Sequence, residues 1–427
     1  MKKLTSLLIL LLLVSICKAG FAYNVPETVK IGLFYGNAAK DTITISTEAG
    51  IELYDGKILI STSPAFTFSV NKDGKLSANN SKETYIVSSD AFLKPVKGFI
   101  SVNSTQYRGT VLLKVDSKKK ITVINEVNTE EYLYSVLPKE MSTGFPYEAL
   151  KAQAVCARSY AYRQIMLNGY ASYGAHVDDS VSYQVYNNLT TNDKVIQAVN
   201  ETAGKVLKFG DEVAAAYYFS TSCGYTTNET IWKNGLEENS YISGKLLNDS
   251  KKRLNLKDEK TFREFILNET YETYDSGETW YRWEMTVPVE HISNTICSME
   301  NIGTVKNIEV TERNDGGVVH KVLITGEDGK LEIVYEHAIR TALNGKGQTI
   351  KRIYGKDATG GNMLPSGFFV IDKVEEDGKL TAFHFRGGGF GHGAGMSQNG
   401  ANHMAEDGKN YEEILALFYE GTTLSAI

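Results

Sequence analysis

Apolar and polar residues alternate over short runs in the first third of the chain, from Asn24 to about Asn125. The runs are rich in β-branched and aromatic residues, and Asp-Gly and Asn-rich stretches separate them, which predicts strands joined by turns. The predicted strands are Val29–Phe34, Thr42–Ile45, Ile58–Ile60, Phe66–Val70, Val111–Leu113 and Ile121–Ile124. We therefore predict a β-rich N-terminal lobe over residues 23–125.

The spacing changes to a helical one after this lobe. Asn128 stands three residues before Glu131, as in a capping box, and apolar residues recur at helical spacing up to Leu137. Pro138 lacks an N–H, so we expect it to end this helix, and Pro146 is suited to the first position of a second helix. The second helix carries a narrow stripe of small and apolar residues, namely Leu150, Ala154, Ala157, Ala161 and Ile165.

Glu140 therefore falls in a corner between two predicted helices. A carboxylate held in a restricted, partly apolar corner can have a raised pKa, which a general acid working near neutral pH requires. A glutamate just past a helix end is more often solvated, so spacing alone favours the plainer interpretation.

The remainder mixes strands and helices without a βαβ rhythm. Ala214–Phe219 predicts a buried strand that opens into hydroxyl-bearing residues around Gly224, either at the rim of a cleft or in a turn that satisfies its own backbone. The charged stretch 241–278 predicts a surface insertion. Strands are predicted at 282–287, within 305–335 and at 368–371, and a short helix at 336–343. We predict an α+β fold of mixed antiparallel strands with a few helices.

A glycine-rich run follows at Gly387–Gln398. Such glycine density lets the backbone approach a ligand or another segment closely, but the run lacks the Lys-Ser/Thr of a P-loop and the strand–helix context of a dinucleotide site. His392, isolated among glycines, lines a cleft or sits in a tight loop packed on a sheet; the sequence leaves both open.

Composition sets limits on these interpretations. A chain of 427 residues exceeds what one hydrophobic core usually serves, which predicts two lobes. The formal net charge of −6 gives no basic patch for nucleic acid. The 25 tyrosines suit a sugar-lined cleft but also ordinary β-surfaces, so they are weak support.

Residues 1–22 have the pattern of a signal peptide, with a short cationic start and an apolar stretch from Leu4 to Ile16. We expect an exported protein at the cell surface or wall, and an uncleaved membrane anchor stays open. Without this segment Cys156, Cys223 and Cys297 remain, and an odd number argues against a disulfide scaffold.

His176, Asp178 and Asp179 resemble the start of a metal site. Four-coordinate zinc needs three or four ligands, and no second His or Cys lies nearby in the sequence. We predict no metal and no cofactor.

Four stretches resemble the stage II sporulation protein D family, which includes the amidase-enhancer proteins. They are Y-R-G with I-N-E-V-N-T-E-E-Y-L; V-L-P-K-E-M with E-A-L-K-A-Q-A-V-C-A-R-S-Y-A; F-S-T-S-C-G-Y-T; and G-G-G-F-G-H-G-A-G-M-S-Q-N-G-A. They are spread in the family's order over most of the range 107–427. The resemblance implies a catalytic region over 126–427, with a core motif segment at 107–235 and a C-terminal motif at 387–401.

The resemblance further implies a lytic transglycosylase that cleaves peptidoglycan glycan strands, preferably free of peptides, during sporulation or engulfment. Glu140 would then be the single acid/base, and the product would carry a 1,6-anhydro-N-acetylmuramic acid end. The implied partners are the glycan, a wall amidase and other sporulation membrane proteins. Seven residues would bind the sugar, namely Ser222, Tyr225, His392, Ser397, Gln398 and Arg158 in the matched motifs and Tyr186 outside them.

Two other hypotheses stay open. Because the same motifs occur in amidase enhancers, the chain is alternatively a non-catalytic wall-binding protein that stimulates an amidase. A thiol hydrolase using Cys223 and His392 ranks last, since a nucleophilic cysteine needs a neighbouring base that sequence separation cannot show.

Overall fold

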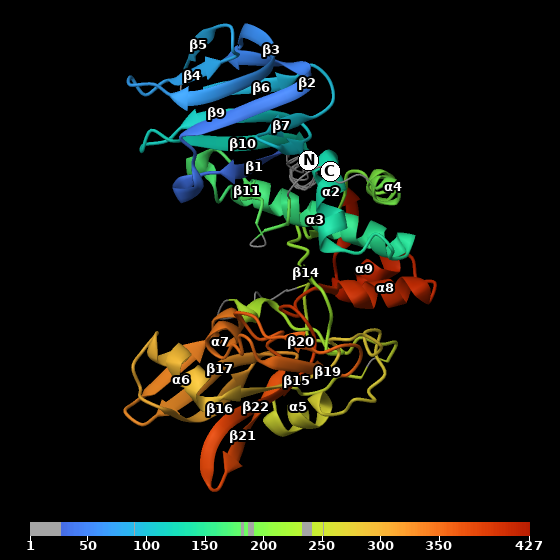
Figure 1. Cartoon of the computed structure of the whole chain (residues 1–427). Coiled ribbons are helices and arrows are strands. Elements are labelled where there is room, and N and C mark those ends of the chain that lie inside the picture. The colour runs from blue at the N-terminus through green and yellow to red at the C-terminus, as the bar shows by residue number, and fades with distance from the viewer. Residues whose placement is uncertain (1–26, 89, 181–182, 187–191, 233–240, 251) are drawn as a thin grey trace, which may run out of the picture.

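The computed structural model describes residues 27–88, 90–180, 183–186, 192–232, 241–250 and 252–427 (Figure 1). The predicted signal peptide lies outside these residues. Strands from the N-terminal part form one end of the molecule and strands from the C-terminal half form the other, with α3, α8 and α9 between them. The buried apolar residues form two separate clusters, and the second lies wholly within the C-terminal half. The predicted α+β class is confirmed.

The N-terminal lobe is built on one large sheet with the strand order β11-β1-β10-β9-β6-β2-β3-β4-β5; in addition, β7 pairs with β2, and β8 pairs with β7. All pairs are antiparallel except β1 with β11. The strands are β1 Thr28–Phe34, β2 Thr42–Asp55, β3 Ile58–Val70, β4 Leu76–Asn79, β5 Thr84–Val87, β6 Asp90–Pro95, β7 Ile100–Val102, β8 Thr105–Tyr107, β9 Thr110–Val115, β10 Ile121–Asn128 and β11 Val177–Asp178. Strand β10 runs across the predicted boundary at residue 125 and leads directly into the first helix.

That helix, α2, spans Thr129–Glu140, and the Asn128 side chain accepts the N–H of Glu130 at 2.9 Å as its N-cap. The prediction that Pro138 ends the helix is wrong, because Pro138 lies inside its last turn. Proline there removes a single hydrogen-bond donor near an end where carbonyls already lack partners, and Met141 closes the turn by donating its N–H to Leu137. Glu140 is consequently the last helical residue.

Helix α3, Tyr147–Leu167, lies with α8 and α9 between the two groups of strands, and Pro146 is its N-cap. The predicted stripe is buried, with every member at most 5% exposed. Burial extends around the helix to Gln153, Cys156 and Arg158, because α3 packs against helices and strands on several sides. These neighbours are α2, α4 (Asp193–Glu201), α8 (Gln398–Glu406), α9 (Tyr411–Phe418), β12 (Lys205–Phe209) and β13 (Glu212–Val213); β24 (Thr423–Ala426) pairs with β12.

The C-terminal lobe holds two further sheets with orders β20-β19-β15-β22-β21 and β16-β17-β18. Its strands are β15 Trp283–Pro288, β16 Val305–Arg313, β17 Val319–Gly326, β18 Lys330–Val334, β19 Thr349–Arg352, β20 Ala358–Thr359, β21 Phe369–Glu376 and β22 Lys379–Gly387. Its helices are α5 Glu259–Ile266, α6 Val289–Cys297 and α7 Glu336–Ala342; short 3₁₀ helices lie at Gly36–Ala38, Ala171–Tyr173 and Glu229–Ile231. The strands and the short helix predicted beyond residue 280 are confirmed.

The stretch 241–278 is more than the predicted surface insertion. Phe262 and Phe265 of α5 are buried, and so is Asp275. Apolar residues at helical spacing on α5 anchor the stretch to the rest of the protein, which the high charge of the sequence concealed.

Two short parallel strands, β14 (Tyr218–Phe219) and β23 (Met396–Ser397), join the glycine-rich run to the middle of the chain. Only the last two residues of the predicted strand Ala214–Phe219 pair in this way. Gly395 has a φ of +80°, and a Cβ atom there would lie 2.0 Å from the carbonyl oxygen of Tyr217. The glycine run therefore serves close approach to another segment of the chain, one of the two roles that its composition predicts.

Candidate functional site

Glu140 lies at the C-terminal end of α2, and its side chain is half-buried. Its Oε1 atom accepts the main-chain N–H of Val185 at 3.0 Å. Val185 belongs to the segment that follows β11, so two parts of the chain far apart in sequence fix the carboxylate.

Burial raises the pKa of Glu140, and the hydrogen bond from Val185 offsets part of that shift. Among the described residues, no charged side chain is close enough to contribute to the shift. Glu140 thus lies in a partly desolvated place, where a larger share of it stays protonated near neutral pH than for an exposed glutamate.

Three tyrosines surround this carboxylate. Burial is the largest cause of the raised pKa of Tyr132, Tyr160 and Tyr218, and the negative charge of Glu140 adds to each shift. The Gln184 side chain accepts the Tyr132 hydroxyl at 3.2 Å and donates to the Tyr218 hydroxyl at 3.1 Å. Because Tyr218 accepts this bond, its own proton remains available to another acceptor.

His392 is brought to the same region by the pairing of β14 with β23. A hydrogen bond with the backbone of Tyr218 and another from the N–H of Ala394 to its Nδ1 atom, at 3.1 Å, orient the imidazole ring. Burial lowers the pKa of His392 to about 4, so the ring is neutral at pH 7. His392 is therefore a neutral, positioned side chain next to the tyrosines around Glu140.

A set of aromatic side chains, which we call the aromatic strip, extends from this region into the C-terminal lobe. It consists of Tyr160, Tyr217, Trp232, His392, Phe390 and Trp280. Successive ring centroids lie 6.0 Å apart for Tyr160 and Tyr217, 4.7 Å for Tyr217 and Trp232, and 5.1 Å for Trp232 and His392. Phe390, two residues before His392, lies 4.7 Å from Trp280. Trp232 and Phe390 are 38% and 40% exposed, so the strip presents flat apolar faces to solvent.

Ser222 and Ser397, both predicted to bind sugar, face the protein interior instead. Each is 0% exposed, and each donates its hydroxyl to Asp275, at 2.8 Å and 2.6 Å respectively. The N–H of Ser222 also donates to Asp275 at 3.0 Å. Asp275 thereby joins three segments, and the two serines hold the strand pair β14–β23 in place.

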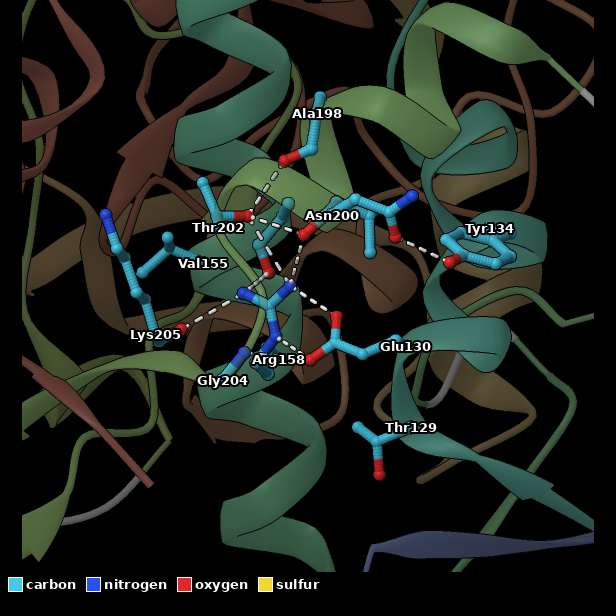
Figure 2. Close-up of polar contacts among 12 residues, drawn as sticks. Thr129, Glu130, Tyr134, Val155, Arg158, Ala198, Asn200, Thr202, Gly204 and Lys205 are labelled. Carbon is cyan, nitrogen blue, oxygen red and sulfur yellow. Dashed lines mark hydrogen bonds and ion pairs between the residues drawn. The ribbon is translucent and has the colours of Figure 1, made fainter.

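Arg158 is likewise enclosed, and its guanidinium is held by polar contacts within the protein (Figure 2). Its fully buried guanidinium makes two hydrogen bonds with Glu130, at 2.8 Å and 2.6 Å. It also donates to the carbonyls of Val199 and Lys205, at 3.2 Å and 3.0 Å. With its donors used in this way, Arg158 fixes α2 to α3 and α4.

The other predicted sugar-binding residues are also enclosed. Tyr186 is 1% exposed and donates its hydroxyl to Asn125 at 2.6 Å. Tyr225 is 2% exposed, and its hydroxyl contacts the backbone of Leu254. Gln398 is 8% exposed and contacts Gln153. Of the seven predicted sugar-binding residues, His392 alone is half-buried and the other six are buried.

The thiol hypothesis is wrong for Cys223. Burial raises the pKa of its thiol to about 11, and the sulfur lies 3.7 Å from the carbonyl oxygen of Tyr225. A thiol in this environment is not the thiolate that nucleophilic catalysis requires. The described cysteines Cys156, Cys223 and Cys297 are all free.

His176 and Asp178 are held in separate polar contacts. The N–H of Lys30 donates to the Nδ1 atom of His176, while Asp178 accepts from Tyr35, Tyr170 and Ser180. Within the described ranges, no three residues of the types His, Cys, Asp and Glu are grouped as metal ligands. The absence of a metal stays a prediction, to be checked by elemental analysis.

Sequence reasoning missed the tyrosines around Glu140, the Gln184 bridge and the role of Asp275. The abundance of tyrosine was a signal, but it does not show which rings lie close together.

In the described part of the chain, no helix is both long and apolar enough to span a membrane.

The fold and this site define an α+β protein with one half-buried glutamate in a tyrosine-rich surrounding. A family model described as stage II sporulation protein matches residues 117–209, and one described as a domain of unknown function matches residues 228–395. The chain is 30% identical over 318 residues to stage II sporulation protein D of Bacillus subtilis, covering 71% of this chain and 76% of that protein.

Two further relatives extend the comparison. An uncharacterized protein of Brachyspira hyodysenteriae is 30% identical over 326 residues, covering 76% of this chain and 73% of the relative. The amidase enhancer of Bacillus subtilis is 28% identical over 403 residues, covering 90% of this chain and 53% of the enhancer. The chain thus spans about half of that enhancer. It belongs to the stage II sporulation protein D family and has a cell-wall function of that type.

Proposed function

We propose that the chain is a lytic transglycosylase that cleaves peptidoglycan glycan strands with Glu140 as its acid and base. The observation that carries this proposal is the half-buried Glu140 carboxyl group, whose pKa is raised by burial and not by another charge. Most glycosidases need two carboxylates. A reaction in which the substrate supplies its own nucleophile needs one.

The chemistry balances with this one group. Protonated Glu140 gives its proton to the bridging oxygen, and the bond between that oxygen and C1 of N-acetylmuramic acid breaks. The C6 hydroxyl oxygen of the same sugar bonds to C1, which closes the 1,6-anhydro ring. The C6 hydroxyl proton returns to Glu140, so the carboxyl group ends the cycle as it began.

The surroundings of Glu140 suit such a substrate. Tyr218, whose hydroxyl proton is available, would donate to a sugar oxygen. Neutral His392 would help to orient the glycan strand beside Tyr218. The aromatic strip offers rings on which the apolar faces of sugars stack. We further propose that peptide-free strands are preferred and that residues 1–22 direct export to the cell surface or wall, either cleaved or as an anchor.

To test the proposed activity, purified protein is incubated with peptide-free glycan strands and strand cleavage is measured. We expect wild type to cleave, Glu140→Gln to lose cleavage, and Trp232→Ala to weaken substrate affinity more than turnover, because Trp232 only stacks. Glu309→Gln is the matched control, since Glu309 is exposed in β16 of the other lobe. Unimpaired cleavage by Glu140→Gln would refute the assignment of the acid.

A second candidate is a non-catalytic amidase enhancer. The observation in its favour is the match to the Bacillus subtilis amidase enhancer over 90% of this chain. Such a protein leaves the glycan whole and accelerates peptide release only when a wall amidase is added. Running the same incubation with and without an amidase separates the two functions.

A further inference from the structure

Arg108 differs from the other shielded arginines of this protein. It is half-buried, and its Nε atom is enclosed without a hydrogen-bond partner, as are the Nε atoms of Arg282 and Arg386. Those two arginines form hydrogen bonds through their other nitrogens, whereas within the described residues the Arg108 guanidinium forms none. Among the described residues, its guanidinium takes part in no ion pair. The remaining buried or half-buried arginines are all engaged by carboxylates, carbonyls or hydroxyls, namely Arg158, Arg163, Arg263, Arg282, Arg313, Arg340, Arg352 and Arg386.

The guanidinium of Arg108 is nevertheless held in place. It lies over the ring of Phe99 at 5.1 Å and over the ring of Tyr134 at 5.5 Å, measured to the ring centroids. Tyr134 is itself fixed, because its hydroxyl donates to Asn200 at 2.6 Å (Figure 2). Rings on the faces of a guanidinium leave the donors at its edge available, and fewer rotamers must be lost when a ligand binds.

The backbone under Arg108 is equally constrained. The Asn125 side chain donates to the carbonyl oxygens of Arg108 and Thr110, both at 2.9 Å. Gly109 has a φ of +77°, and a Cβ atom there would lie 2.2 Å from the carbonyl oxygen of Glu126. The Tyr-Arg-Gly motif therefore presents its arginine from a rigid turn.

Arg108 opens into a cavity of about 390 Å³. Its other charged lining residues are Lys94 and Glu131, and neither forms an ion pair within the described residues. Its remaining lining residues are Pro95, Gly98, Phe99, Gly109 and Thr110. The cavity thus combines two unpaired cations with one unpaired anion.

This cavity is separate from the Glu140 site. Glu131 and Glu140 are nine residues apart on α2, which corresponds to about 13 Å along the helix axis and roughly half a turn around it. A ligand at Arg108 therefore lies on the opposite face of α2 from the proposed acid.

We propose that the Arg108 cavity binds the carboxylate of a peptide, with Glu131 accepting an N–H group of the same ligand. A carboxylate matches the planar fork of a guanidinium with two parallel hydrogen bonds, and Lys94 adds positive charge. An acceptor of the opposite charge in the same cavity favours a ligand that carries N–H donors beside its carboxylate, as a peptide does. Wall peptides and protein C-termini both have this chemistry, and the site does not depend on the proposed transglycosylase reaction.

The test uses the purified full chain and ligand-observed saturation-transfer NMR, with D-alanyl-D-alanine and L-alanyl-L-alanine as probes. Each dipeptide is compared with its C-terminal amide and with inorganic phosphate as a competitor. We expect the free acid to bind, the amide to bind at least about tenfold more weakly, and phosphate not to displace the dipeptide at equal concentration. Preference for the D,D form assigns the ligand to wall peptides, and preference for the L,L form assigns it to protein termini.

Variants show whether the binding occurs at this cavity. Arg108→Gln should abolish it, and Arg108→Lys, which keeps the charge but loses the fork, should weaken it. Glu131→Gln should weaken it less, and the exposed Arg253→Gln is the matched control that should not change it. No saturation transfer at about 20 mM dipeptide, equal binding of acid and amide, displacement by phosphate, or binding unchanged in both Arg108 variants would each overturn the proposal. Glycan cleavage is measured in parallel, so that failure of either function is seen separately.

Discussion

The carboxylate of Glu140 accepts the main-chain N–H of Val185 across 3.0 Å. This contact fixes the end of α2 to the segment beyond β11. A main-chain N–H does not titrate and is not removed when a side chain is replaced. The hydrogen bond that positions Glu140 therefore does not depend on the protonation of another side chain. The substitution Glu140→Gln keeps an oxygen acceptor for this bond.

Glu140→Gln should therefore reduce the rate of strand cleavage by about 10²- to 10⁴-fold, the usual contribution of a general acid, while the melting temperature changes little. The cleavage rate and thermal unfolding of both proteins, measured in one buffer, check this. A large loss of stability would show that the glutamate is structural.

The pH dependence of cleavage should reflect the raised pKa of Glu140. The acid must be protonated to act, so activity should be retained at low pH and lost as the pH rises through its folded pKa, above the ordinary range for glutamate. The same sign holds for stability, because a carboxyl whose pKa is raised by folding stabilises the fold below its unfolded pKa and loses that contribution as the pH rises. A rate that increases through this range would contradict the assignment.

Asp275→Ala should lower the free energy of unfolding by about 2–4 kcal/mol, because it leaves the Ser222 and Ser397 hydroxyls and one N–H buried without an acceptor. The exposed Asp357→Asn is the control and should change stability little. Urea unfolding of the three proteins measures the difference.

Stability should also depend on pH through Asp275, since burial raises its pKa from 3.8 to about 6. The folded protein then keeps a proton that the unfolded chain loses, so this contribution is fully present below pH 3.8 and disappears as the pH rises through about 6. Unfolding measured between pH 4 and 7 should show a decline in wild type that Asp275→Asn lacks. Identical slopes would mean that Asp275 has an ordinary pKa.

Glu130→Ala should destabilise the protein by about 3–5 kcal/mol, because it leaves the fully buried Arg158 without its counter-charge. The pair of half-buried Arg163 with exposed Glu212 provides the control, and Glu212→Ala should cost less than about 1 kcal/mol. If Arg158 instead bound the glycan, an Arg158 variant would raise the KM for strands without loss of stability.

The sequence predicted the elements with strong local signals. Alternating residues gave the N-terminal strands, and the stripe from Leu150 to Ile165 gave the buried face of α3. The predicted helix end at Pro138 was wrong because a proline in the last turn removes only one backbone hydrogen bond from the helix, which the helix tolerates. Asp275 could not be found, since its partners Ser222 and Ser397 lie 53 and 122 residues away in sequence.

The candidate site was predicted only in part for the same reason. Glu140 was singled out by its motif, whereas Tyr218 and Gln184 reach it through tertiary packing. Candidate residues such as Arg158 and Tyr186 could not be sorted into ligand-binding and packing roles without their burial. Exposure and unused hydrogen-bond donors, which only the structure provides, decide that question.

Mass spectrometry of peptide-free glycan strands incubated with this protein alone tests the central claim most directly. A transglycosylase that uses Glu140 should give products about 18 mass units lighter than hydrolytic ones, with 1,6-anhydro muramyl ends that resist borohydride reduction and that are absent with Glu140→Gln. Reducible ends would contradict it by showing that water is the nucleophile. Intact strands across a range of pH would contradict it in favour of an amidase enhancer.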